Sequence, residues 1–171
     1  MTISKTSIYG LFFAAFLMFS LTSCGDDDLQ SKTFTYDFNT GQVAADFAYV
    51  GTHSDDLSAT IKVDEREDGD SDITITINNS IDGETYRTHA HDMEDAATTP
   101  NGTPYNETPN ADVFAGPIEG NGGAASLTKK SSLSYEEITT TYDGFFVIHD
   151  PLQDLSTVDP TTYVILGIFA R

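Results

Sequence analysis

The chain has 171 residues, of which 27 are acidic and 8 are basic, so its formal charge is −19. This balance excludes a basic nucleic-acid-binding face, because neutralising phosphates requires clustered Lys and Arg. The single Cys excludes both an internal disulfide and a four-Cys zinc site. The hydrophobic fraction of 39% is too high for a disordered acidic chain and predicts a packed core, and the length fits one domain.

The first 23 residues have the pattern of a secretory signal peptide. Lys5 gives a positively charged start, residues 8–21 form an apolar run, and Thr22 and Ser23 provide an exit of small residues. The apolar run is shorter than the roughly 20 residues that a transmembrane helix needs. We therefore expect residues 1–23 to be removed on export.

Leu21-Thr22-Ser23-Cys24 resembles the lipobox of bacterial lipoproteins, in which the Cys becomes the lipidated first residue of the mature chain. The resemblance implies a lipid anchor at Cys24, and each buried CH₂ of an acyl chain contributes roughly 0.8 kcal/mol to membrane binding. The acidic run at 26–28 looks like the tether of Bacteroidetes-type lipoproteins that reach the cell surface; a solvated spacer is the alternative. We expect residues 24–32 to be a tether on an outer-membrane protein that faces the periplasm or the cell surface.

Residues 33–171 are dominated by a period of two, in which apolar residues alternate with Thr and other polar residues. This is the pattern of half-buried strands, and no segment has the apolar stripe of a long amphipathic helix. The sequence therefore predicts one all-β domain, an antiparallel Greek-key sandwich of about eight strands. The candidate strands cover residues 34–38, 43–49, 57–63, 73–77, 85–91, 124–128, 144–149 and 162–170.

Two connections are too long for simple hairpin turns. Residues 92–123 contain four of the six prolines, and residues 150–161 contain the other two. Long ordered loops without secondary structure are usually functional or disordered. We expect two long loops beside the strands that carry the histidines.

Three of the four histidines are candidate metal ligands. His89 and His91 alternate along one predicted strand, so their side chains project to the same face, roughly 6.6–6.8 Å apart along the chain. That spacing allows two imidazoles to reach one metal ion. His149 ends the strand predicted at 144–149 and would join them from a neighbouring strand. The alternative is three unconnected surface histidines, and His53 is expected in a loop.

The segment 73–92 resembles the approach to the copper-binding His-x-His strand of copper/zinc superoxide dismutases, where a strand, a Gly-containing turn and a strand ending in His-x-His follow one another. Segments 143–150 and 164–170 are similar to that family's late copper-His strand and its Gly-containing closing strand. The related CHRD sandwich domains share these features. The resemblance spans residues 57–171 and implies a superoxide dismutase-like β-sandwich.

By this resemblance, His89, His91 and His149 match three copper ligands of the family. A zinc site of the family type is not expected, because residues 92–148 contain no His. The Arg that guides superoxide in the family aligns with Pro160 or its neighbours. The resemblance therefore implies copper as the cofactor, and it leaves open whether the protein is an enzyme.

Residues flanking the histidines extend the candidate site. On a continuous strand, Arg87 and Met93 would share the face of His89 and His91. Imidazoles with a thioether suit Cu(I) better than zinc or calcium, so Met93 is a candidate fourth ligand, with plain packing as the alternative. Arg87 would attract superoxide or another anion. Asp92, Glu94 and Asp95 would either offset the charge of Arg87 or accept hydrogen bonds from imidazole N–H groups.

The leading prediction is a cell-envelope lipoprotein that binds one copper ion through three histidines and retains at most residual superoxide chemistry. The alternative is a non-catalytic, CHRD-like binding or structural module whose histidine cluster is vestigial. The expected partners are the membrane, through Cys24, and the metal ion. Nucleic acid is not expected, and the sequence indicates no protein partner.

Overall fold

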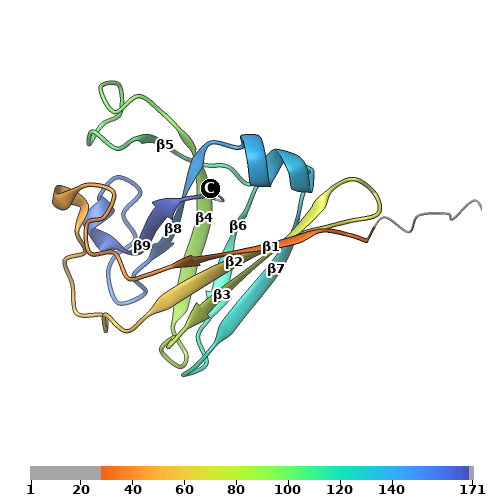
Figure 1. Cartoon of the computed structure of the whole chain (residues 1–171). Helices are drawn as coiled ribbons and strands as arrows, with labels where there is room; N and C mark the ends of the chain where they lie inside the picture. Colours follow the sequence, from red (N-terminus) through yellow and green to blue (C-terminus); the bar gives the residue numbers. More distant parts are fainter. Residues whose placement is uncertain (1–27, 170–171) are drawn as a thin grey trace, which may run out of the picture.

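The computed structural model describes residues 28–169, which form two antiparallel sheets (Figure 1). One sheet has four strands in the order β1-β2-β3-β7; the other has the order β5-β4-β8-β9, with β6 also paired to β4. The all-β sandwich predicted from the sequence is confirmed. The strands are β1 Ser31–Tyr36, β2 Ser58–Glu65, β3 Ser71–Asn78, β4 Thr85–Met93, β5 Tyr105–Pro109, β6 Ala115–Glu119, β7 Ala125–Ser131, β8 Gly144–His149 and β9 Tyr163–Ile168.

The strand order does not follow the chain order. β7 pairs with β3, and β8 pairs with β4, although other strands separate each pair along the sequence. These are connections of the Greek-key type, in which a strand returns beside an earlier one. The second pairing places the end of β8 beside β4, and both strands carry histidines.

Two predicted segments lie partly or wholly outside the described residues. The predicted signal peptide and Cys24 are among the residues that the structure does not describe, and so is most of the acidic run. β1 begins at Ser31, within the range predicted as a tether. No helix in residues 28–169 is long and apolar enough to cross a membrane.

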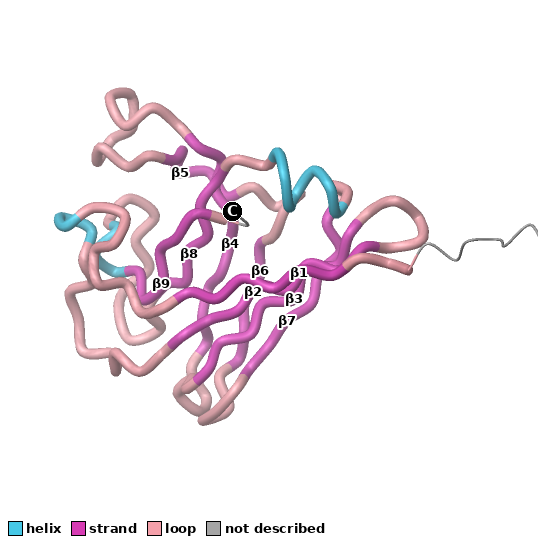
Figure 2. Tube along the Cα trace, viewed as in Figure 1, coloured by secondary structure: helices cyan, strands magenta, loops and turns pink. Residues whose placement is uncertain are grey.

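The strand predicted at 43–49 is wrong. Helical structure in the described chain consists of short turns (Figure 2), and one of them, Ala45–Phe47, lies in this segment. The Asn39 side chain donates hydrogen bonds to the backbone carbonyls of Phe47, at 2.8 Å, and Tyr163, at 3.1 Å. These bonds hold the segment against the second sheet, where Phe47 is buried. The apolar alternation therefore reflects packing of a loop rather than strand pairing.

The segment 92–123 was predicted to be one long loop and instead contains β5 and β6. Pro109 is the last residue of β5, and Pro117 lies within β6, which pairs only with β4 and so is an edge strand. Proline lacks the N–H that a central strand must donate but is tolerated at sheet edges and strand ends. Proline normally argues against a strand, so the sequence pattern did not indicate β5 or β6. Both prolines occupy positions at which a strand tolerates proline.

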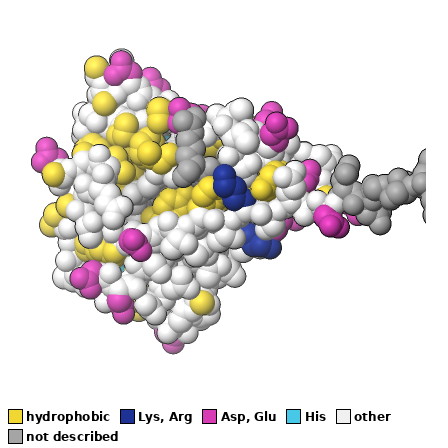
Figure 3. Space-filling view, in the orientation of Figure 1, with side chains coloured by type: hydrophobic (Ala, Val, Ile, Leu, Met, Phe, Trp, Pro, Cys, Tyr) yellow, Lys and Arg dark blue, Asp and Glu magenta, His cyan; other side chains and the backbone are white. Residues whose placement is uncertain are grey.

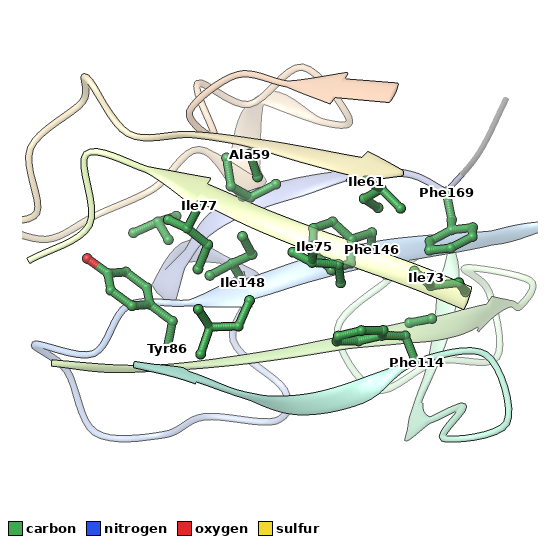
Figure 4. Close-up of a cluster of buried hydrophobic side chains, with 14 of the residues drawn as sticks. Ala59, Ile61, Ile73, Ile75, Ile77, Tyr86, Phe114, Phe146, Ile148 and Phe169 are labelled. Atoms are coloured by element: carbon green, nitrogen blue, oxygen red, sulfur yellow. The ribbon is translucent and has the colours of Figure 1, made fainter. Parts of the chain in front are cut away.

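The space between the sheets is filled by alternate residues of facing strands (Figure 4). Ile61 on β2 pairs with Ile75 on β3, and both are fully buried, as are Phe146 and Ile148 on β8. Burying an aliphatic side chain of this size stabilises the fold by about 1.5–3 kcal/mol. This core fixes which face of β4 and β8 points outward.

β4 alternates between two environments. Tyr86, Thr88 and Ala90 are buried on the side of the main core, so Arg87, His89 and His91 point to the outer face of the second sheet. That outer face is only partly exposed to solvent. A second buried cluster covers part of it, formed by Phe47, Tyr105, Phe145, Val147, Tyr163 and Leu166.

Candidate metal centre

The three histidines singled out in the sequence come together on the outer face of the second sheet. His89 on β4 lies opposite Val147 on β8, and His149 follows two residues later on the same face. The Nε2 atoms of His89 and His149 are 3.4 Å apart. The ring centroids of His89 and His91 are 4.6 Å apart, and those of His89 and His149 are 5.0 Å apart.

The three imidazoles are held in their neutral form. His91 is 1% exposed and His149 is 3% exposed, while His89 is partly buried. Burial lowers the pKa of His89 to about 3, with further lowering by His91 and His149, and it lowers the pKa of His149 to about 4. Burial also lowers the pKa of His91. Each ring therefore keeps one nitrogen lone pair at neutral pH, which is the form that binds metals.

Several polar atoms around these rings are buried without a well-formed hydrogen bond. Such groups are uncommon in folded proteins, because each costs desolvation energy that no bond returns. In residues 28–169 every buried side-chain nitrogen or oxygen of this kind belongs to one cluster of five residues. The atoms are both ring nitrogens of His91, Nδ1 of His149, Oε2 of Glu107 and the hydroxyl oxygens of Tyr105 and Tyr163. They are not isolated, because His91 interacts with the backbone of Asn106 and Thr108, and the two tyrosine hydroxyls interact with each other.

Two tyrosines cover the histidine rings from the β5 and β9 sides. The centroid of the Tyr105 ring lies 4.9 Å from that of His91, and the centroid of the Tyr163 ring lies 4.6 Å from that of His149. Burial, together with the charge of Glu107, raises the pKa of Tyr163 to about 12. Burial also raises the pKa of the Glu107 carboxyl. The imidazoles thus sit in a region of low polarity.

Sequence reasoning missed Tyr105, Glu107 and Tyr163. Tyr105 and Glu107 lie in β5, within the segment predicted to be a loop, so no face was assigned to them. Tyr163 lies in a predicted strand, and its pairing with His149 across β8 and β9 depends on a register that the sequence does not specify. Alternation within 105–109 was the only available signal, and Pro104 and Pro109 obscured it.

The separation of His89 and His149 fits a shared metal ion. Two nitrogens bound to one tetrahedral metal at about 2.0–2.1 Å are about 3.3 Å apart, close to the 3.4 Å between the two Nε2 atoms. Across residues 28–169, however, no group of three or more His, Cys, Asp and Glu side chains is already arranged to hold a metal ion. The pair has the spacing of two ligands, which is also the spacing of a hydrogen bond between the two rings, and His91 does not complete a three-nitrogen set in this arrangement.

A pocket of about 430 Å³ opens beside this pair. His89 and His149 form part of its lining, together with Arg87 of β4 and Lys129 of β7. Arg87 contributes to lowering the pKa values of both histidines. No Asp or Glu lines the pocket. The nitrogen donors beside this pocket therefore lack the neighbouring carboxylate oxygens that calcium and magnesium prefer.

Two other predicted members of the site have different surroundings. Met93 ends β4 with its side chain 44% exposed and does not line the pocket. The Asp92 carboxylate accepts hydrogen bonds from the Asn110 side chain, at 2.7 Å, and from the Tyr142 hydroxyl, at 3.1 Å. Asp92 is thereby engaged with groups other than the imidazoles.

The remaining histidine, His53, belongs to the other side of the sheet. It lies in a loop, as predicted, but is buried, and its Nε2 is 2.8 Å from the Tyr86 hydroxyl. Nearby, the Tyr49 hydroxyl and the Gln153 side chain donate hydrogen bonds to Asp150. Because Asp150 directly follows His149, these bonds anchor the chain where it leaves the site.

Comparisons with known proteins add no family to this description. No protein-family model matches the sequence, and no curated protein matches it.

Proposed function

We propose that the protein is a lipid-anchored protein of the cell envelope that binds one copper ion through His89, His91 and His149. The observation that carries the proposal is the 3.4 Å separation of the His89 and His149 Nε2 atoms, next to the buried imidazole of His91. Binding a metal would give the lone pairs of these buried rings a strong partner. The lipid anchor at Cys24 rests on the sequence alone.

Copper is favoured by the chemistry of the donors. Three neutral imidazoles suit copper and zinc, and for a given set of nitrogen ligands divalent copper binds more tightly than zinc. The zinc site of the superoxide dismutase type lacks its histidines in this sequence. Copper would supply one-electron chemistry, and residual superoxide chemistry is part of the proposal. Met93 stays outside the proposed ligand set because its side chain is exposed away from the pocket lining.

The alternative is a non-catalytic, CHRD-like binding or structural module with a vestigial histidine cluster. It is favoured by the lack of a ready three-ligand arrangement in the described residues. On that view the buried rings are packing elements of the outer face, and copper would bind weakly or at exposed carboxylates instead.

Copper titration of the full-length protein in detergent, followed by native mass spectrometry and calorimetry, tests the proposal. We expect one copper per chain and loss of that binding in a His89→Ala, His149→Ala variant. Asp68→Asn with Asp70→Asn is the matched control, because these carboxylates lie on the β2–β3 hairpin, outside the histidine site, and would report non-specific binding.

The outcomes separate the two candidates. Absence of stoichiometric copper, or binding that survives the double histidine variant, would overturn the copper proposal and leave the structural module. If copper binds as expected, a cytochrome-reduction assay of the loaded protein then measures whether superoxide is consumed. Circular dichroism of each variant confirms that its fold is retained.

A further inference from the structure

The pocket beside His89 and His149 has an unusual charge for this protein. Acidic residues outnumber basic ones 27 to 8 in the chain, and Asp and Glu are spread over the face in Figure 3. The pocket lining nevertheless contains two basic residues, Arg87 and Lys129, and no acidic one. The local charge is therefore opposite to that of the molecule.

Neither basic residue of the pocket is neutralised by a carboxylate. Within residues 28–169, the ion pairs involve Lys62, Arg66 and Lys130, whereas Arg87 and Lys129 take part in none. Two cations that share one pocket repel each other, and the neutral imidazoles next to them provide no compensation. An anion placed between them would remove this repulsion and gain charge-assisted hydrogen bonds.

The backbone of β6 shapes the approach of Lys129. Pro117 lies opposite Arg87 in the β4–β6 register, and Gly116 is next to it. A Cβ atom at Gly116 would lie 3.0 Å from Cε of Lys129 and 2.7 Å from a methyl carbon of Leu127. The Lys129 side chain therefore crosses β6 where no side chain stands in its way, and its Nζ donates a hydrogen bond to the Ala115 carbonyl. This path brings a residue of the other sheet into the histidine pocket.

The size and walls of the pocket indicate more than a diatomic or spherical anion. A volume of about 430 Å³ greatly exceeds the roughly 30 Å³ that one water occupies in the liquid. Pro109, Pro117 and Leu155 supply apolar wall, and Leu155 is otherwise 53% exposed. Pockets of this size with apolar walls and a few convergent polar groups are typical of small-molecule sites.

We propose that this pocket binds a small organic carboxylate, with the carboxylate between Arg87 and Lys129 and the apolar part against Leu155 and the two prolines. A guanidinium forks onto a carboxylate with two parallel hydrogen bonds, which selects this class over a halide. The inference rests on the proposed function only in that it places the carboxylate next to the copper ligands. Arg87 and Lys129 line the pocket in the metal-free chain. Carboxylate binding is therefore tested on the metal-free protein, separately from copper binding.

The experiment is a titration of the metal-free, full-length protein in detergent with acetate, hexanoate and benzoate, followed by calorimetry. We expect saturable binding of hexanoate or benzoate. Arg87→Gln and Lys129→Gln should each weaken it by about tenfold, the loss expected for one charged hydrogen bond. Lys62→Gln is the matched control, because it makes the same charge change at an exposed residue paired with Asp64. Benzyl alcohol, which lacks the carboxylate, should not bind.

The inference is overturned if none of the three carboxylates binds saturably, or if Lys62→Gln weakens binding as much as Lys129→Gln does. It is also overturned if benzyl alcohol binds as tightly as benzoate. Copper titration of the Arg87→Gln, Lys129→Gln variant keeps the two proposals apart. If this variant keeps its copper stoichiometry but loses carboxylate binding, both the copper proposal and the carboxylate proposal are supported. If the wild type binds carboxylates but no stoichiometric copper, only the copper proposal is overturned.

Discussion

The Nε2 atoms of His89 and His149 lie 3.4 Å apart although 60 positions separate the two residues in the chain. At this distance two imidazolium rings would repel each other strongly, so at least one ring must be neutral. Pairing of β4 with β8 places the rings on one face, and the outer cluster around Tyr105 and Tyr163 removes them from water. The fold therefore favours a state in which both rings bind a metal or remain unprotonated.

This relationship predicts how the stability of the metal-free protein depends on pH. The folded-state pKa values of His89, about 3, and His149, about 4, lie below the ordinary value of 6.5. Between about pH 4 and 6.5 the unfolded chain therefore binds more protons, and the free energy of unfolding falls as pH falls through this window. The slope is at most about 1.4 kcal/mol per pH unit for each histidine.

Urea unfolding at pH 7.5 and pH 4.5 measures this slope. The comparison is between the metal-free wild type and a His89→Gln, His149→Gln variant. Carboxylates titrate in both proteins and their contribution cancels in the difference. We expect the variant to lose less stability than the wild type on acidification; equal losses would show that these histidines are not held neutral by the fold.

A pair of tyrosine variants tests whether the buried hydroxyls at the site are less well satisfied than a buried hydroxyl elsewhere in the fold. Tyr163→Phe removes a buried hydroxyl that interacts with the Tyr105 hydroxyl but forms no other hydrogen bond within the described residues, so it should change the unfolding free energy by less than about 1 kcal/mol. Tyr86 is equally buried, but its hydroxyl accepts from the Ile81 N–H and contacts His53 Nε2. Tyr86→Phe should therefore cost about 1–3 kcal/mol. Denaturant unfolding of both variants measures these changes. A comparable loss of unfolding free energy in the two variants would contradict the prediction.

The role of Met93 is settled by Met93→Leu, which keeps the volume and removes the sulfur. Because the side chain is exposed and does not line the pocket, we expect Cu(I) and Cu(II) affinities to stay within about twofold of the wild type. Competition with a chromophoric copper chelator measures both affinities. A selective loss of Cu(I) affinity would restore the thioether to the ligand set.

The lipid anchor is tested in cells by metabolic labelling with palmitate. The wild-type protein should incorporate label and partition with membranes, whereas Cys24→Ser should do neither, because Cys24 is the only thiol that can carry acyl chains. A wild type that stays unlabelled would remove the anchor from the proposal. The unlabelled protein would still contain the described sandwich.

Most of the fold was predictable from local pattern. β2 and β3 follow the alternation of β-branched and polar residues, because one face of each strand must be buried against the other sheet. β8 is a continuous apolar run instead, and it is buried on both faces. The pattern failed at Ala45–Phe47, where apolar residues serve loop packing, and at β5 and β6, where prolines occupy edge positions. Local periodicity reports burial, and burial does not always mean strand pairing.

The histidine site was likewise predictable only in part from the sequence pattern. The sequence by itself determined that His89 and His91 share a face, because side chains alternate along any strand. Only the tertiary structure decided that His149 approaches His89, that Tyr105 and Tyr163 cover the rings, and that Lys129 reaches the pocket from the other sheet. These relationships depend on which strands pair and in what register, and that choice is set by the packing of the whole core rather than by any one segment. The excess of acidic residues was evident from the composition. Only the tertiary structure showed that the lining of one pocket has the opposite charge, with two basic residues and no acidic one among the described residues.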